Sequence, residues 1–104
     1  MITKHILYIG LNDKDTKQQE ITTLDAYKII QNCVIAVGYD GATITEATGI
    51  YKHDDGAIVI EKSLEVSVLG AEDRKTIELV ERVKAALNQE SIAVQKLKIN
   101  SELV

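Results

Sequence analysis

The chain has 104 residues, with 12 basic and 16 acidic side chains, a net charge of −4 and a single cysteine. A chain of this length is expected to form a single domain over residues 1–104, without room for a cleft between two domains. Lys and Arg are scattered among Asp and Glu, which argues against nucleic acid as a partner because nucleic-acid affinity rests on neutralised phosphates. No segment reaches the roughly 18 apolar residues of a membrane span, and the N-terminus lacks a secretory leader, so we expect a cytoplasmic protein outside the membrane.

The first half of the chain predicts a strand, a flexible loop and then a helix. Residues 4–12 are a compact apolar run rich in β-formers. Thr22 and Asp25 have capping-box spacing, with Asp in place of the usual Glu, and Gly38 stands where a helix C-cap is expected. Apolar residues recur at the helical period: Leu24, Tyr27, Ile30, Val34 and Val37. We predict a helix over residues 22–37, with a strand as the competing local interpretation of its β-branched second half.

Two strand-like runs, residues 41–53 and 57–70, flank an Asp-Gly turn. Asp-Gly between such runs is a strong hairpin signal, because both central residues of a type I′ turn need a positive φ. In the second run apolar and polar residues alternate, so one face is expected to be buried and the other to meet solvent or another subunit. The expected buried face, which Lys62 interrupts, comprises Ile58, Ile60, Leu64, Val66 and Val68.

The last third of the chain predicts a helix over residues 71–89, a strand over residues 91–99 and a frayed tail. Glu72 and Asp73 lie at the positive end of the helix dipole. The apolar stripe of the helix is expected to comprise Ile77, Val80, Val83 and Leu87. The order βαββαβ predicts an α+β, ferredoxin-like fold, with a four-stranded antiparallel sheet and both helices on one face.

The segment "GATITEATGIY" has the form Gly-x-Thr-[Val/Ile] with a later Gly, and "EKSLEVSVLGAEDRKTIELVERVKAAL" combines a strand with the helix after it. The first segment resembles the second strand of PII-type nitrogen-signalling proteins, and the second segment is similar to their third strand and second helix. The resemblance implies a PII-like fold and a trimer. This chain has only "KHDDG" where PII-type proteins carry a long T-loop, and "NQES" where they carry a Gly-rich phosphate-binding loop. Their ATP-binding and 2-oxoglutarate-binding residues therefore have no counterparts here.

Residues 40–70 also resemble the core of a family of small, uncharacterised bacterial domains. The pattern is Asp-Gly-x-Thr, then Ala-x-Gly, a short Asp-Gly turn, and Glu-x-Ser on the next strand. The matching positions are Asp40, Gly41, Thr43, Ala47, Gly49, Asp55, Gly56, Glu61 and Ser63. This resemblance implies a fold and does not indicate a chemical activity.

The sequence contains three potential metal ligands in a row, and His5 as a separate candidate residue. His53, Asp54 and Asp55 are consecutive at a predicted tight turn, where side chains diverge, whereas metal sites draw ligands from separated positions. The turn interpretation is favoured, and no metal site is predicted. His5 lies among apolar neighbours and is expected to be a packed or edge histidine.

Glu61 and Ser63 share one face of the third predicted strand and form the best candidate polar cluster. Glu46 or Thr48 would join them if the hairpin register allows it. Paired carboxylates can serve acid–base chemistry, but no nucleophile–base pair is evident, so a polar sheet face or a subunit contact is the favoured interpretation. The candidate ligand-binding residues are Glu46, Glu61, Ser63 and His5, with no catalytic residue assigned.

We therefore expect an oligomeric, non-catalytic protein, either a ligand-binding or a regulatory domain, and we expect no cofactor. The alternative is a small ferredoxin-fold enzyme, similar to oxygenases or isomerases, with a pocket between sheet and helices and Glu61, Glu46 and His5 converging in it. Self-association is expected as a homotrimer or homodimer, through the open sheet face or a strand edge. In the first strand His5, Leu7, Ile9 and Leu11 cannot share a face with Ile6 and Tyr8, so one set must look away from the helices.

Overall fold

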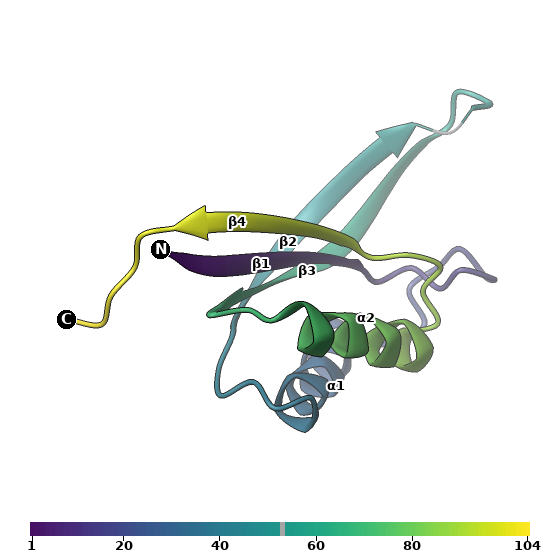
Figure 1. Ribbon diagram of the computed structural model, residues 1–104. Helices are drawn as coiled ribbons and strands as arrows, with labels where there is room; N and C mark the ends of the chain where they lie inside the picture. The colour runs from purple at the N-terminus through teal and green to yellow at the C-terminus, as the bar shows by residue number, and fades with distance from the viewer. Residues whose placement is uncertain (53) are drawn as a thin grey trace.

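The computed structural model describes residues 1–52 and 54–104. Its elements, in chain order, are β1 Ile2–Gly10, α1 Thr23–Ala36, β2 Thr43–Lys52, β3 Ile58–Leu69, α2 Asp73–Leu87 and β4 Ala93–Ile99. The four strands form one antiparallel sheet in the order β2-β3-β1-β4, and both helices lie against the same face of it (Figure 1). The predicted ferredoxin-like α+β fold is confirmed.

Helix α1 begins where the sequence predicted. Thr22 is the N-cap, and its side chain accepts a hydrogen bond from the Asp25 backbone N–H at 3.1 Å. The helix ends one residue before Val37, and Gly38 follows with a φ of +97°, a conformation that glycine adopts without strain. The competing strand interpretation of its second half is wrong.

The core lies between the helices and the helix-facing side of the sheet. Its largest fully buried apolar side chains come from β1, β3 and both helices: Leu7, Ile9, Ile30, Leu64, Val66, Val68, Leu79 and Val83. The predicted helical stripes were partly wrong at their edges. Leu24 and Tyr27 of α1 are exposed, and Ala26 is buried in their place. In α2, Ile77 is exposed and Leu79 is buried, whereas Val83 and Leu87 are buried as predicted.

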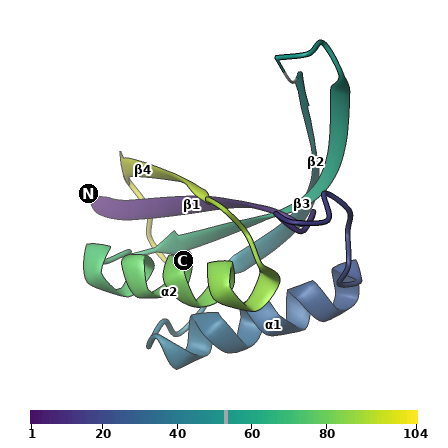
Figure 2. The same cartoon turned by 90° about the vertical axis from the view of Figure 1, so that its right-hand side faces the viewer.

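The β2–β3 hairpin extends past the helices and projects from the body of the molecule (Figures 1 and 2). Leu64, on the part of β3 that the helices cover, is 1% exposed. Ile58 and Ile60 share its face but are 70% and 67% exposed, so their predicted burial is wrong. The physical reason is that no helix reaches the outer part of the hairpin.

The hairpin turn joins Lys52 to Ile58, which are paired across the strands. Gly56 has a φ of +89°, whereas the φ of Asp55 is not positive, so the turn departs from the predicted type I′ geometry. Asp55 instead accepts a hydrogen bond from the Ala57 backbone N–H through its side chain, at 2.9 Å. His53, the first of the three potential metal ligands considered at this turn, lies outside the described residues.

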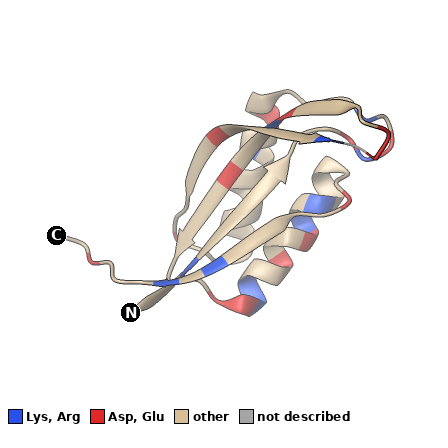
Figure 3. Cartoon of the chain, turned by 90° about the horizontal axis from the view of Figure 1, so that it is seen from above, with Lys and Arg blue, Asp and Glu red and all other residues tan. Residues whose placement is uncertain are grey.

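The side of the sheet opposite the helices is the open face, seen in Figure 3. His5, Leu7, Ile9 and Leu11 are buried toward the helices, while Ile6 and Tyr8 lie on the open face and are half-buried. The two sets of β1 side chains therefore separate as the alternation requires. Helix α2, at the edge of the same view, carries both acidic and basic residues.

Candidate functional site

The hairpin register decides which of the predicted site residues meet. Glu46 is paired with Leu64, whose side chain is buried toward the helices, so Glu46 projects to the helix side of the sheet. Glu61 and Ser63 have the opposite parity and lie on the open face. His5 is fully buried on the helix side. The structure therefore keeps Glu61 with Ser63 on one face and separates both from Glu46 and His5.

Glu61 is anchored at the point where β1 ends. Its Oε2 accepts a hydrogen bond from the backbone N–H of Asn12 at 2.8 Å. Its carboxylate also lies over Gly10, where a Cβ would be only 2.6 Å from Oε1. Glycine at position 10 thus leaves the space that the carboxylate occupies. One backbone donor uses one of the roughly four acceptor positions of a carboxylate, which leaves the group able to accept from a ligand.

The loop after β1 is tied to the C-terminal end of α2. Asn88, the C-cap in the left-handed conformation, donates from Nδ2 to Asp13 Oδ2 and to Asp15 Oδ2, both at 2.9 Å. The buried Gln89 donates from Nε2 to the carbonyl of Asn12 at 2.6 Å. The hydrogen bond from Asn88 lowers the pKa of Asp13, so this carboxylate is charged at neutral pH. The loop predicted as flexible is held at defined points.

A cavity of about 260 Å³ opens between this loop, the hairpin and the segment before β4. It is lined by Asn12, Asp13, Lys14, Lys17, Tyr51, Val59, Glu61, Gln89, Glu90 and Ser91. The lining combines two lysines, three carboxylates, side-chain amides and one tyrosine ring. We call it the Glu61 cavity. Such a lining can bind a small polar molecule that carries both hydroxyls and a flat ring.

No group of three or more His, Cys, Asp or Glu side chains within residues 1–52 and 54–104 is arranged to hold a metal ion. Over the same described ranges, no helix is both long enough and apolar enough to cross a membrane.

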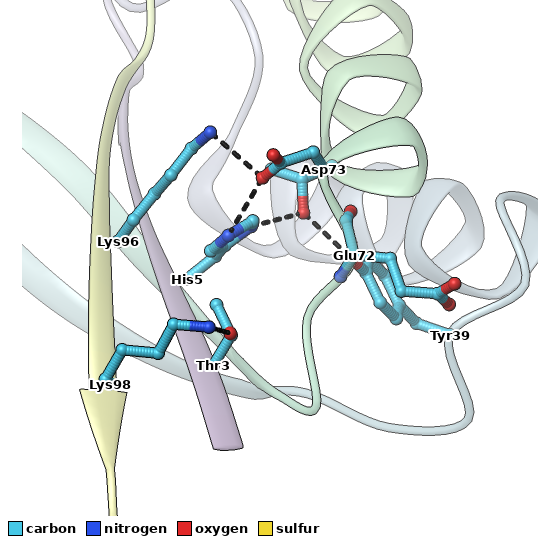
Figure 4. A network of polar contacts seen from close by, with 8 residues as sticks. Thr3, His5, Tyr39, Glu72, Asp73, Lys96 and Lys98 are labelled. Carbon is cyan, nitrogen blue, oxygen red and sulfur yellow. Dashed lines mark hydrogen bonds and ion pairs between the residues drawn. The ribbon is translucent and has the colours of Figure 1, made fainter. Parts of the chain in front are cut away.

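His5 takes part in a second polar network, at the opposite end of α2 (Figure 4). Its Nδ1 lies 2.7 Å from Thr76 Oγ1, which lies 2.7 Å from the hydroxyl of Tyr39. The Tyr39 hydroxyl accepts from the Glu72 N–H at 3.0 Å and lies 3.0 Å from the Glu72 carbonyl, so its single proton goes either to that carbonyl or to Thr76. On the other side of the ring, Nε2 lies 3.5 Å from Asp73 Oδ1. Burial lowers the pKa of His5, partly offset by the Asp73 carboxylate.

Most of the residues that form the Glu61 cavity and the His5 network were not predicted from the sequence. Gly10 and Asn12 stood at the end of a strand, and Gln89 in a segment taken as the end of a helix. Thr76 carried a usable signal: it lies three residues before Leu79 on the stripe that the structure buries, and a polar residue on such a stripe needs a partner. His5 carried another, since it alternates with the buried Leu7.

The order of elements, the sheet and the placement of the helices define an α+β protein of the ferredoxin-like class. The chain belongs to the family described as "Protein of unknown function (DUF3574)", whose model matches residues 4–101. Comparison with curated protein sequences finds no significant match.

Several solved structures are similar in fold. A phage SAM lyase in complex with S-methyl-5'-thioadenosine has a TM-score of 0.72 and 21% identity, covering 93% of this chain and 81% of the lyase. The periplasmic divalent cation tolerance protein CutA from Archaeoglobus fulgidus has a TM-score of 0.63 and 15% identity, covering 96% and 87%. GlnK of B. subtilis, in a complex with ATP, has a TM-score of 0.58 and 11% identity, covering 92% and 84%. The PII-like resemblance is thus confirmed at the level of the fold.

Proposed function

We propose that the protein is a non-catalytic regulatory domain that binds a small molecule in the Glu61 cavity and works as a homo-oligomer. The proposed ligand carries an adenosine group and no polyphosphate chain. The observation that supports this most directly is the position of the Glu61 carboxylate. Its Oε2 lies 2.8 Å from the backbone N of Asn12, which donates to it, in a cavity that Tyr51 also lines.

The lining of the cavity suits the parts of such a ligand. The carboxylate of Glu61 can accept hydrogen bonds from ribose hydroxyls, and the lining of the same cavity includes Tyr51, an aromatic residue. Two of the similar structures contain adenosine-bearing molecules, S-methyl-5'-thioadenosine and ATP. The segment between α2 and β4 has no Gly-rich phosphate loop, which favours a ligand of the first kind.

Self-association is supported by apolar side chains on the projecting hairpin. Ile50 and Ile60 are paired across its strands and Ile58 lies beside them, and all three are about 70% exposed. A cluster of exposed isoleucines on a monomer is typical of an interface. Size exclusion with light scattering on the unmodified protein tests this, since the chain mass is 11.5 kDa and we expect two or three times that value. A mass of one chain at micromolar concentration contradicts it.

Titration calorimetry with S-methyl-5'-thioadenosine, S-adenosylmethionine and ATP tests the ligand. We expect the first two to bind more tightly than ATP. Glu61→Gln should weaken binding about tenfold or more, because a hydrogen bond to a charged group contributes about 1.5–3 kcal/mol. Glu65→Gln is the matched control, since Glu65 lies on the same strand and face but outside the cavity lining. Equal affinities of the two variants would remove Glu61 from the site.

A second candidate function is an enzyme acting on S-adenosylmethionine, which the similarity to a SAM lyase favours. The catalytic group would be Glu61 alone, because Glu46 and His5 lie on the other side of the sheet. Incubation with S-adenosylmethionine followed by chromatography distinguishes the two functions. Release of S-methyl-5'-thioadenosine that Glu61→Gln abolishes would establish the enzyme, whereas binding without turnover supports the regulatory domain.

A further inference from the structure

A second cavity, of about 310 Å³, opens at the N-terminal end of α2, away from the Glu61 cavity. Its polar lining comes from three elements: Thr3 and His5 of β1, Lys96 and Lys98 of β4, and Asp73 of α2. Lys96 and Lys98 reach it because their strand partners, His5 and Thr3, share the helix-facing side of the sheet. Figure 4 shows the His5 ring beside Asp73, with Lys96 reaching the same carboxylate and Lys98 reaching Thr3.

The feature that calls for an occupant is His5 Nε2. His5 is fully buried, and Nε2 has no hydrogen-bond partner among the described residues. Asp73 Oδ1 lies 3.5 Å from Nε2, beyond the usual range of an N–H···O bond. Buried polar atoms in proteins are nearly always paired, with protein, water or a ligand.

The hydrogen-bond chain behind the ring indicates which proton His5 carries. The Tyr39 hydroxyl has a single proton, and Thr76 Oγ1 at 2.7 Å is closer to it than the Glu72 carbonyl at 3.0 Å, which already accepts from the Thr76 N–H. If Tyr39 therefore donates to Thr76 and Thr76 donates to His5 Nδ1, the neutral ring has its N–H at Nε2. The reverse order leaves a lone pair at Nε2 facing the carboxylate of Asp73, which is repulsive. The first arrangement is therefore favoured, and it presents a donor at the cavity wall.

The charges around the cavity favour an anion that can also donate. Lys96 Nζ lies 2.9 Å from Asp73 Oδ1, and Lys98 Nζ donates to Thr3 Oγ1 at 2.7 Å. Helix α2 begins at Asp73 without a side-chain cap from Glu72, so its first backbone N–H groups add positive potential. The hydrogen bond from Lys96 lowers the pKa of Asp73, which keeps this carboxylate ionised. The site thus offers several donors and a single strong acceptor.

We propose that this cavity binds hydrogenphosphate, with its oxygens accepting from His5 Nε2, Lys96 and Lys98 and its P–OH group donating to Asp73. Inorganic phosphate keeps at least one proton at neutral pH and so can satisfy Asp73. Sulfate has no proton to donate, and a phosphate monoester has largely lost its own by pH 7, so both would face Asp73 with like charge. The site is separate from the Glu61 cavity and does not depend on the function proposed there.

Titration calorimetry of the unmodified protein with inorganic phosphate, sulfate and glycerol 3-phosphate at neutral pH tests the proposal. We expect phosphate to bind about tenfold or more tightly than sulfate, because an unpaired charged acceptor is costly. In a matched NMR titration, phosphate should shift the imidazole signals of His5. Absence of phosphate binding at millimolar concentration overturns the proposal. Equal affinity for sulfate, or tighter binding of glycerol 3-phosphate, overturns the role of the P–OH group.

Two variants test the roles of the side chains. Asp73→Asn removes the carboxylate from an exposed position and should abolish the preference of phosphate over sulfate. Lys98→Gln should weaken phosphate binding about tenfold, whereas Lys52→Gln, at the exposed end of the hairpin, should leave it unchanged. Glu61→Gln should also leave it unchanged, so failure of the ligand proposed for the Glu61 cavity leaves this test intact. A phosphate preference that survives in Asp73→Asn contradicts the assigned geometry.

Discussion

Leu64 and Ile60 lie on the same face of β3, four residues apart, yet Leu64 is 1% exposed and Ile60 is 67% exposed. Leu64 is in the body of the molecule, where the helices cover the sheet. Ile60 is in the outer hairpin, which the helices do not reach. The alternation of apolar and polar residues is the same in both places. Periodicity therefore identifies which side chains share a face, but the neighbouring elements decide whether that face is buried.

The largest expected difference between these regions is in folding free energy. Leu64→Ala should lower the free energy of unfolding by about 3 kcal/mol, from lost burial and the cavity left behind. Ile60→Ala should change it by no more than about 0.5 kcal/mol, as for an exposed position. Urea denaturation gives both values, at a concentration where light scattering shows equal mass for the variants. Equal losses would mean that another surface buries the hairpin.

A smaller difference is expected for threonines in the two regions. Thr76→Val keeps the shape of the side chain but removes the hydroxyl between His5 and Tyr39. We expect a loss of about 2 kcal/mol in unfolding free energy, because buried polar atoms lose their partner. Thr48→Val, on the exposed hairpin, is the control and should stay within about 0.5 kcal/mol of the unmodified protein. A neutral Thr76→Val would show that water replaces the hydroxyl.

Element order was predictable because its signals are local. The cap at Thr22, the glycine at 38 and the Asp-Gly turn each act within a few residues, and the structure has an element boundary at each of them. Exposure of Ile58 or Ile77 was not predictable, because it depends on where the other elements end.

The candidate site divides in the same way. Glu61 was found from its place on a strand, but its setting comes from contacts with Gly10 and Asn12, about 50 positions away in the chain, which a single sequence does not show. Whether Glu46 shares a face with Glu61 depends on the register of the hairpin, and the register depends on the length of the turn. A one-residue difference in that turn exchanges the two faces of a strand, and local propensity does not determine it.

His5 should make the stability of the body depend on pH. Burial lowers the pKa of His5, so the unfolded chain binds its proton more readily than the folded protein does. Its contribution is fully present above the unfolded value of about 6.5 and is lost as the pH falls through the lower folded value. Three carboxylates with lowered pKa values, Asp13, Glu72 and Asp73, lose their contributions only below about pH 5.

The measurement is the urea midpoint at several pH values between about 7.5 and 5, in the unmodified protein and in His5→Gln. We expect the midpoint to fall with pH in the unmodified protein and to change less in the variant. The variant is less stable at every pH, so the slope is the relevant quantity. Parallel curves would show that His5 does not titrate in this range.

The smallest effect on folding is expected at the outer hairpin, where the effect on association should be largest. Ile58→Ser combined with Ile60→Ser should leave the unfolding free energy of the single chain within about 0.5 kcal/mol. The same change should lower the mass measured by light scattering toward one chain. Ile77→Ser is a control of similar exposure on α2 and should leave the mass unchanged. If the Ile77 variant dissociates instead, the interface lies on the helices.

The place of β1 in the sheet has a consequence for synthesis. β1 is made first but lies between β3 and β4, and Ile2 is paired with Ile99. As the chain leaves the ribosome, β1 can pair with β3 once the hairpin has emerged, while its other edge stays open until β4 is complete. An unpaired edge is a template for another chain, and pairing between distant residues is slow. The edge of β1 that pairs with β4 therefore stays open to mispairing throughout the synthesis of α2, after the other edge has been covered.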